Sequence, residues 1–120
     1  MNWTSWLIVL SIFVVFLLLR RVGQVSARAA HEYLQHGALV IDVRSEPEFA
    51  ARHLRGVISM PVDRIESMAP QRLKDPNQVL LLHCQSGMRS AVARKKLAGM
   101  GFTRVFNLGS YGRAARIVDQ

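Results

Sequence analysis

The stretch LLLHCQSGMRSA, from Leu80 to Ala91, joins an apolar run to a helical pattern and contains the only cysteine of the chain. Residues 78–84 are nearly all apolar, which is typical of a strand buried on both faces of a sheet. Residues 88–100 have the pattern of a helix that ends at the glycines beside Met100. Gly87, between the two, permits a tight turn of the backbone. The stretch therefore predicts a strand, a turn and a helix in direct succession.

Helical patterns and apolar runs alternate on both sides of this unit as well. Short buried strands that alternate with helices are typical of an α/β fold with a mainly parallel sheet. A chain of 120 residues has room for one such domain and not for two. We expect helices over 27–35, 47–53 and 63–68, strands over 38–42, 57–60 and 104–107, and loops at Pro70 and over 75–77.

The N-terminal region is far more apolar than the rest of the chain. Residues 1–19 contain no charged side chain, and residues 6–19 are almost entirely Leu, Ile, Val and Phe. As a helix that rises ~1.5 Å per residue, residues 1–19 would span about 28 Å, close to the thickness of the hydrocarbon core of a bilayer. Two tryptophans lie near one end, and the basic pair Arg20 and Arg21 follows the other. This arrangement is typical of a transmembrane helix.

Two other interpretations of this region agree less well with its sequence. A cleavable signal peptide has basic residues before its apolar run, whereas here the basic pair follows the run. A buried core helix is usually shorter than this run. We therefore predict a retained anchor over residues 1–21, with residues 3–19 in the membrane, followed by one domain over residues 22–120.

The basic pair also predicts the orientation of the anchor. Lys and Arg concentrate on the cytoplasmic side of membrane-spanning segments. The domain is therefore expected in the cytoplasm, attached to the inner membrane of a bacterial-type cell by a single-pass anchor. A reducing cytoplasm would also keep the lone Cys84 free of disulfides.

Composition limits the partners and cofactors of the chain. Its net charge of +8 favours anionic partners, such as lipid headgroups or a small anionic substrate. Nucleic acid is not expected, because no helix interleaves basic and aromatic residues. The single cysteine cannot form an internal disulfide, and no group of Cys, His and carboxylate residues has the spacing of metal ligands. We expect neither a metal nor a cofactor.

Cys84 lies where chemistry is expected in a parallel sheet, at the carboxyl end of a central strand. The free backbone N–H groups and the dipole of the helix that follows would favour a thiolate over a thiol. Arg89 would oppose the dipole of its own helix unless an anion binds in the turn. Taken singly, Cys84 fits a buried apolar residue and Arg89 a solvated one, but together they predict a thiolate loop that binds an anion. His83 is excluded as its general base, because adjacent strand residues point to opposite faces.

Three separated motifs resemble the rhodanese family of sulfurtransferases. CQSGMRS, at residues 84–90, resembles the active loop of the family, and LVIDVRSEPEFAARHLRGVISMP, at 39–61, resembles its upstream signature. VFNLGS, at 105–110, is similar to the region after the last strand of the family. The likeness extends over nearly everything from Gln24 onward. It implies a rhodanese-like α/β fold, with a mainly parallel sheet wrapped by helices, and a cysteine persulfide intermediate.

The resemblance implies that the chain moves sulfur from a donor such as thiosulfate to cyanide, a thiol or a protein acceptor. Cys84 would be the catalytic nucleophile, and Arg89 would orient the loop and attract the anionic donor. Asp42, Arg44 and Glu48 would support the loop, with Arg44 and Glu48 paired behind it. The substrate-binding N–H groups would be those of Gln85, Ser86, Gly87, Met88, Arg89 and Ser90.

Two other functions remain as alternatives. Cysteine-dependent phosphatases and arsenate reductases of similar architecture have a loop one residue longer than the four residues between Cys84 and Arg89. A membrane-tethered sulfur-relay or protein-binding module, with little turnover of small molecules, also fits the motifs. The chain differs from the family pattern at four positions outside the loop. We expect these differences to affect the recognition of partners more than the chemistry at Cys84. These differences are Arg52, Arg55, Ser110 and Ala114.

Overall fold

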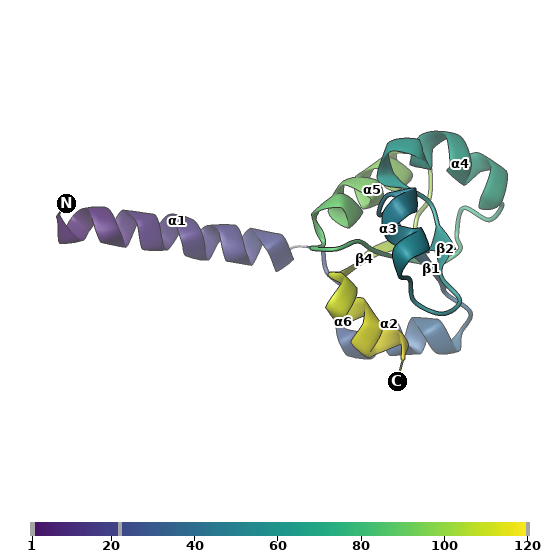
Figure 1. Ribbon diagram of the computed structural model, residues 1–120, viewed down its shortest axis with the longest axis horizontal. Coiled ribbons are helices and arrows are strands. Elements are labelled where there is room, and N and C mark those ends of the chain that lie inside the picture. The colour runs from purple at the N-terminus through teal and green to yellow at the C-terminus, as the bar shows by residue number, and fades with distance from the viewer. Residues whose placement is uncertain (1, 22, 120) are drawn as a thin grey trace.

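Four parallel strands form one sheet in the computed structural model, which describes residues 2–21 and 23–119 (Figure 1). The spatial order of the strands is β2-β1-β3-β4. The predicted α/β fold with a parallel sheet is confirmed. The strands are β1 (Leu39–Asp42), β2 (Ile58–Ser59), β3 (Leu80–His83) and β4 (Val105–Gly109), each within or close to its predicted range.

Helices cover both faces of the sheet (Figure 1). Alternate side chains of β3 point to opposite faces: Leu80 and Leu82 pack with α4 and α5, while Leu81 packs with α2 and α6. Burial on both faces explains the continuous apolar run that predicted β3. The helices of the domain are α2 (Ala27–Gln35), α3 (Glu46–Ala51), α4 (Ile65–Arg72), α5 (Met88–Gly99) and α6 (Tyr111–Val118), with a short 3-10 helix at Val62–Arg64.

The register of the sheet brings the carboxyl ends of three strands side by side. Asp42 of β1 pairs with His83 of β3, and His83 pairs with Gly109 of β4. Ligands bind at this edge in open parallel sheets. Cys84, the first residue after β3, therefore leaves the sheet at the place where a site is expected.

Two helices differ from their predictions. The helix α6 was not predicted, although Ser110 caps it by accepting a hydrogen bond from the N–H of Arg113 at 3.2 Å. The predicted loop at Pro70 is wrong, because α4 continues past it to Arg72. Pro70 lies on the exposed side of α4, whereas Ile65 and Ala69 are its buried residues.

The helix α1 (Trp3–Arg21) extends away from the domain as a single rod (Figure 1). Its large apolar side chains from Trp3 to Leu19 are between 41% and 76% exposed. Within the described part of the chain, however, no helix combines the length and apolar character that crossing a membrane requires. The transmembrane helix predicted over 3–19 is therefore not confirmed.

Candidate active site

Cys84 lies at the start of the turn that connects β3 to α5, and its side chain is fully buried. Its backbone N–H donates a hydrogen bond to the carbonyl of Gly109 at 3.3 Å, so the turn begins from a fixed point on β4. Gly87 ends the turn with a φ of 94°, in the left-handed region that favours glycine. The strand, turn and helix predicted around Cys84 are confirmed.

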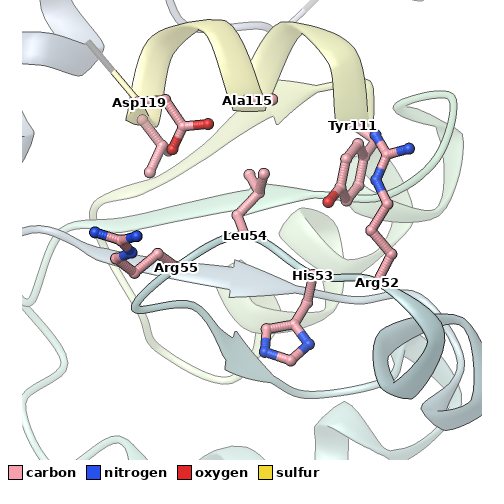
Figure 2. Close-up of a pocket in the computed structure, with 8 residues that line it drawn as sticks. Arg52, His53, Leu54, Arg55, Tyr111, Ala115 and Asp119 are labelled. Carbon is pink, nitrogen blue, oxygen red and sulfur yellow. The ribbon is translucent and has the colours of Figure 1, made fainter.

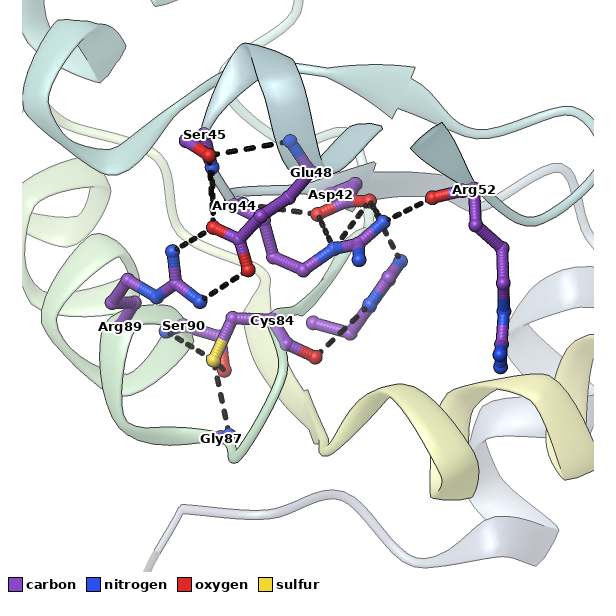
Figure 3. Close-up of polar contacts among 10 residues, drawn as sticks. Asp42, Arg44, Ser45, Glu48, Arg52, Cys84, Gly87, Arg89 and Ser90 are labelled. Atoms are coloured by element: carbon purple, nitrogen blue, oxygen red, sulfur yellow. Dashed lines mark hydrogen bonds and ion pairs between the residues drawn. The ribbon is translucent and has the colours of Figure 1, made fainter. Parts of the chain in front are cut away.

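The turn directs hydrogen-bond donors at the Cys84 sulfur (Figure 3). The N–H groups of Gly87 and Ser90 lie 3.0 Å and 3.4 Å from Sγ, and the Ser90 hydroxyl lies 3.5 Å from it. Burial raises the pKa of the Cys84 thiol, but the hydrogen bonds from Ser90, Gly87 and Ser86 outweigh it, so the pKa lies below its ordinary value. A thiolate is the reactive form of cysteine. The loop therefore favours a nucleophile.

The sequence analysis assigned no role to Asn107, which holds the loop from β4. Its side-chain N–H₂ donates to the carbonyl of Gly87 at 3.1 Å, and its Oδ1 accepts from the Ser90 hydroxyl at 2.7 Å and from the Gly109 N–H at 2.9 Å. Asn107 is buried, so it replaces solvent as the partner of these groups. A polar residue within the apolar run VFNLG was the signal in the sequence, because a strand buried on both faces rarely contains one.

Arg89 pairs with Glu48, which corrects the expected pair between Glu48 and Arg44. The two guanidinium nitrogens of Arg89 lie 2.6 Å and 3.1 Å from the two carboxylate oxygens of Glu48 (Figure 3). Hydrogen bonds from Arg89 are the largest cause that lowers the pKa of Glu48, to about 2. Ser45 fixes Glu48 in a capping box at the start of α3. The ion pair therefore ties the first turn of α5 to α3.

Arg44 instead pairs with Asp42, two residues before it. Its Nε lies 3.0 Å from both carboxylate oxygens of Asp42, and its Nη2 lies 2.7 Å from Oδ2. The same Nη2 donates to the carbonyl of Arg52 at 2.6 Å, and the guanidinium lies 4.6 Å from the centre of the Tyr111 ring. Both charged groups are buried behind the sheet edge. This pair joins β1 to the chain after α3 and to α6.

His83 does not contact the Cys84 sulfur, in agreement with its exclusion as a general base. Its Nδ1 lies 3.5 Å from the carbonyl of Cys84, and its ring packs edge-on against Tyr111. The ring is fully buried, and burial lowers its pKa. Its Nε2 lies 4.0 Å from Asp42 and has no hydrogen-bond partner. His83 therefore belongs to the buried Asp42–Arg44 cluster and not to the reactive loop.

The remaining predicted loop residues differ in their exposure to solvent. Gln85, Ser86 and Met88 are exposed at the rim of the loop, whereas Gly87 and Ser90 are buried beneath it. The substrate-binding role of the loop stays a prediction. Across residues 2–21 and 23–119, no group of His, Cys, Asp or Glu side chains could hold a metal ion.

A cavity of about 840 Å³ lies under α6, away from the thiol (Figure 2). Arg52 and Arg55, two of the residues that differ from the family pattern, lie on its wall. The guanidinium of Arg52 lies 4.4 Å from the centre of the Tyr111 ring. Cys84 does not line this cavity, so its size does not make it the reactive site. Asp119 lies on the same wall as these arginines.

Comparison with known proteins agrees with this geometry. The model of the rhodanese-like domain matches residues 26–112. The chain belongs to the rhodanese-like family. Thiosulfate sulfurtransferase PspE of Escherichia coli (strain K12) is 30% identical over 69 residues, which cover 58% of this chain and 66% of PspE. The chain thus spans slightly less than two thirds of that relative.

Other relatives match over longer segments of the rhodanese-like domain. Thiosulfate sulfurtransferase GlpE of Pseudomonas fluorescens (strain SBW25) is 30% identical over 89 residues, which cover 74% of this chain and 77% of GlpE. The structure of the human single-domain sulfurtransferase TSTD1 superposes with a TM-score of 0.67 and 29% identity, covering 78% of this chain and 96% of TSTD1. The range matched by the family model includes Cys84 and its loop.

Proposed function

We propose that this rhodanese-like chain is a sulfurtransferase that moves sulfane sulfur from a donor such as thiosulfate to an acceptor through a persulfide on Cys84. The observation that carries the proposal is the pair of N–H groups, from Gly87 and Ser90, that point at the buried sulfur. Such a cradle stabilises negative charge where the reaction places it. The names of the relatives PspE and GlpE support thiosulfate as the donor.

The cycle has two displacement steps. The Cys84 thiolate attacks the outer sulfur of thiosulfate, the sulfur–sulfur bond of the donor breaks, and sulfite leaves with the electron pair. Cys84 then carries a persulfide, whose terminal sulfur bears the negative charge that the loop N–H groups stabilise. An acceptor thiolate or cyanide attacks that terminal sulfur, the persulfide bond breaks, and the Cys84 thiolate is released. No external oxidant or reductant is needed.

Arg89 has a positioning role in this proposal, and attraction of the anionic donor is secondary. Its charge is already paired with Glu48, which reduces the field that a donor would meet. The pair nevertheless fixes the first turn of α5, where the N–H of Ser90 is presented to the sulfur. Phosphatase or arsenate reductase activity remains the weaker alternative, because only four residues separate Cys84 from Arg89, one fewer than in those enzymes.

A sulfur-relay role with one protein partner is the second candidate. The Cys84 side chain is fully buried, so a donor or acceptor must reach the sulfur through the exposed rim of the loop. A dedicated partner that contacts this rim would exclude other thiols. Turnover with small acceptors separates the two roles, because a relay module would accept sulfur from thiosulfate but release it slowly to cyanide.

Mass spectrometry of the full chain after treatment with thiosulfate tests the proposal. We expect one added sulfur on Cys84 and thiocyanate formation when cyanide follows. Cys84→Ser should abolish both and leave the circular dichroism spectrum unchanged, because the substitution is nearly isosteric. Activity close to that of the wild type in Cys84→Ser would rule out the persulfide mechanism.

We also propose that α1 attaches the domain to the inner membrane of a bacterial-type cell, with the domain in the cytoplasm. Large apolar side chains on all sides of α1 favour a lipid environment over water. The basic pair Arg20 and Arg21, at the C-terminal end of α1, favours the cytoplasmic side.

Fusion of a reporter to the C-terminus tests this placement. A fluorescent protein that matures only inside the cell should fluoresce, and alkaline phosphatase, which works only outside, should be inactive. Sedimentation of the chain with membranes after carbonate washing should depend on α1. A chain that stays in the supernatant, or an active phosphatase fusion, would contradict the proposal.

A further inference from the structure

The rhodanese-like domain exposes large apolar side chains next to α1. Outside α1, Met88 and Val92 are the large apolar residues of the described chain that are mostly exposed, at 57% and 50%. They are one helical turn apart on α5, so they share one face of that helix. Figure 1 shows α5 on the side of the domain from which α1 departs. Exposed apolar side chains that gather in one place indicate a binding surface.

An apolar groove of about 280 Å³ lies between this face of α5 and the end of α1. Phe16 and Leu19 line it from α1, and Met88, Ala91 and Val92 line it from α5. The reactive loop contributes the remaining part of the wall. The groove therefore joins the apolar surface of α1 to that of the domain.

A second cavity, of about 270 Å³, adjoins the groove and has a basic wall. It shares Leu19 and Ala91 with the groove and adds Arg94, Lys95 and Asn107. The two cavities together form one continuous surface that is apolar in one part and basic in the other. A ligand that covers both parts needs an apolar chain and an anionic group.

No carboxylate neutralises the basic wall. Among the residues that the structure describes, neither Arg94 nor Lys95 forms an ion pair with a carboxylate. The helices α1 and α5 contain no acidic residue. The Nε of Arg94 donates a hydrogen bond to the carbonyl of Val105 at 3.0 Å, which holds this side chain in place. A guanidinium that is positioned in this way and has no counter-charge favours an anion such as a phosphate group.

The apolar and basic parts follow each other along α1. Both Phe16 and Leu19 line the apolar groove, whereas of these two only Leu19, three residues nearer to the domain, lines the basic cavity. The surface therefore changes from apolar to basic in the direction from α1 to the domain. A phospholipid beside a membrane-attached helix has the same order, because its chains lie along the helix and its phosphate lies toward the aqueous side.

We infer that the groove and the basic cavity together bind one anionic phospholipid, with an acyl chain against Met88 and Val92 and the phosphate at Arg94 and Lys95. This inference rests on the proposed attachment of α1 to a membrane. About 280 Å³ corresponds to about nine water molecules at ~30 Å³ each, which is room for part of an acyl chain and too little for a helix. The bound lipid would lie against the rim of the reactive loop, so that the loop faces the membrane surface.

Native mass spectrometry of the full chain in detergent, with equal amounts of phosphatidylglycerol and phosphatidylcholine of the same chain length, tests the inference. We expect one bound lipid and a preference for phosphatidylglycerol of at least about fivefold, the effect of one basic side chain near an anionic headgroup. Lys95→Gln should remove most of this preference. Lys74→Gln removes the same charge at an exposed position outside both cavities, so it should leave the preference unchanged.

The apolar part of the site has its own variant. Val92→Ser should weaken the binding of both lipids about fivefold and leave the preference for phosphatidylglycerol unchanged, because it removes apolar contact and no charge. Ala98→Ser, at an exposed position of α5 outside both cavities, is the matched control. Inorganic phosphate at the concentration of the lipid should not displace phosphatidylglycerol, since it has no chain for the groove. Equal binding of the two lipids, or equal effects of Lys95→Gln and Lys74→Gln, would overturn the inference. A dimer that Val92→Ser dissociates would overturn it as well, because a second copy would then occupy the groove.

A lipid that dissolves as a monomer separates this inference from the proposed attachment. Dihexanoyl phosphatidylglycerol should bind to the full chain and lose affinity in both Lys95→Gln and Val92→Ser, whether or not α1 lies in a membrane. If the chain leaves the membrane during carbonate washing and still binds this lipid, the attachment fails and the lipid site stands. If the chain stays in the membrane and shows no preference for phosphatidylglycerol, the attachment stands and the lipid site is wrong.

Discussion

Two ion pairs between arginine and carboxylate groups lie at the same edge of the sheet, and they differ in burial. In the Asp42–Arg44 pair, 0% and 6% of the two side chains are exposed, whereas in the Glu48–Arg89 pair the values are 35% and 39%. The first joins β1 to the chain after α3, and the second joins α3 to the helix of the reactive loop. Both pairs join an arginine to a carboxylate. The Asp42–Arg44 pair stabilises the fold, whereas the Glu48–Arg89 pair positions the loop.

The difference follows from the medium around each pair. A buried charge without its partner is costly, because no water replaces the lost contacts. An exposed charge without its partner is solvated, and such a pair adds little to stability. The buried pair should therefore control whether the domain folds. The exposed pair should control the chemistry at Cys84 with little effect on folding.

The largest expected effect comes from breaking the buried pair. Arg44→Met should lower the free energy of unfolding by about 3–5 kcal/mol, because Asp42 is left buried without its partner. Urea unfolding of the full chain, followed by circular dichroism, measures this change. The double variant Asp42→Asn/Arg44→Met should recover part of the loss, since it removes the charge that was left behind. If Arg44→Met lowers the free energy of unfolding by less than about 1 kcal/mol, the buried pair contributes no more to stability than an exposed pair does, and this prediction is wrong.

The exposed pair should act on the reactivity of Cys84. Arg89→Ala removes a positive charge near the thiolate, so the pH midpoint for alkylation of Cys84 should rise. Glu48→Gln leaves Arg89 without a counter-charge, so the midpoint should fall. Stability should change by only about 0.2–1 kcal/mol in either variant. If the alkylation midpoint of Cys84 is unchanged in both variants and the free energy of unfolding falls by several kcal/mol, the role of Arg89 is structural.

The smallest effect is the pH dependence of the exposed pair. The pKa of Glu48 is lowered from 4.5 to about 2 in the folded chain. A lowered carboxyl pKa contributes stability that is fully present above the unfolded value and is lost as pH falls toward the folded value. The wild type should therefore exceed Glu48→Gln in stability above about pH 5, and the difference should disappear toward pH 2. Glutamine can keep the capping box with Ser45, so the comparison isolates the charge. A difference that does not depend on pH would contradict this assignment.

Local sequence patterns were sufficient to predict the strand, the turn and the helix around Cys84. A continuous apolar run, a glycine and a helical repeat depend on neighbouring residues, so they can be read along the chain. The motifs were also sufficient to identify the family. The eight-residue helix α6 was missed, because a short amphipathic segment gains its stability from packing against α2 and β4 and not from its own sequence.

The partners of the charged residues were decided only by the tertiary structure. Glu48 had Arg44 as a neighbour in the sequence, yet it pairs with Arg89, 41 residues away. The capping box orients the Glu48 side chain toward Arg89 of α5. The Arg44 side chain instead folds back onto Asp42 at the end of β1. Asn107 likewise reaches the loop only because β4 lies beside β3 in the sheet. The sequence determined which groups the site contains, whereas the packing of strands and helices determined which of them meet, because such contacts join residues that are distant along the chain.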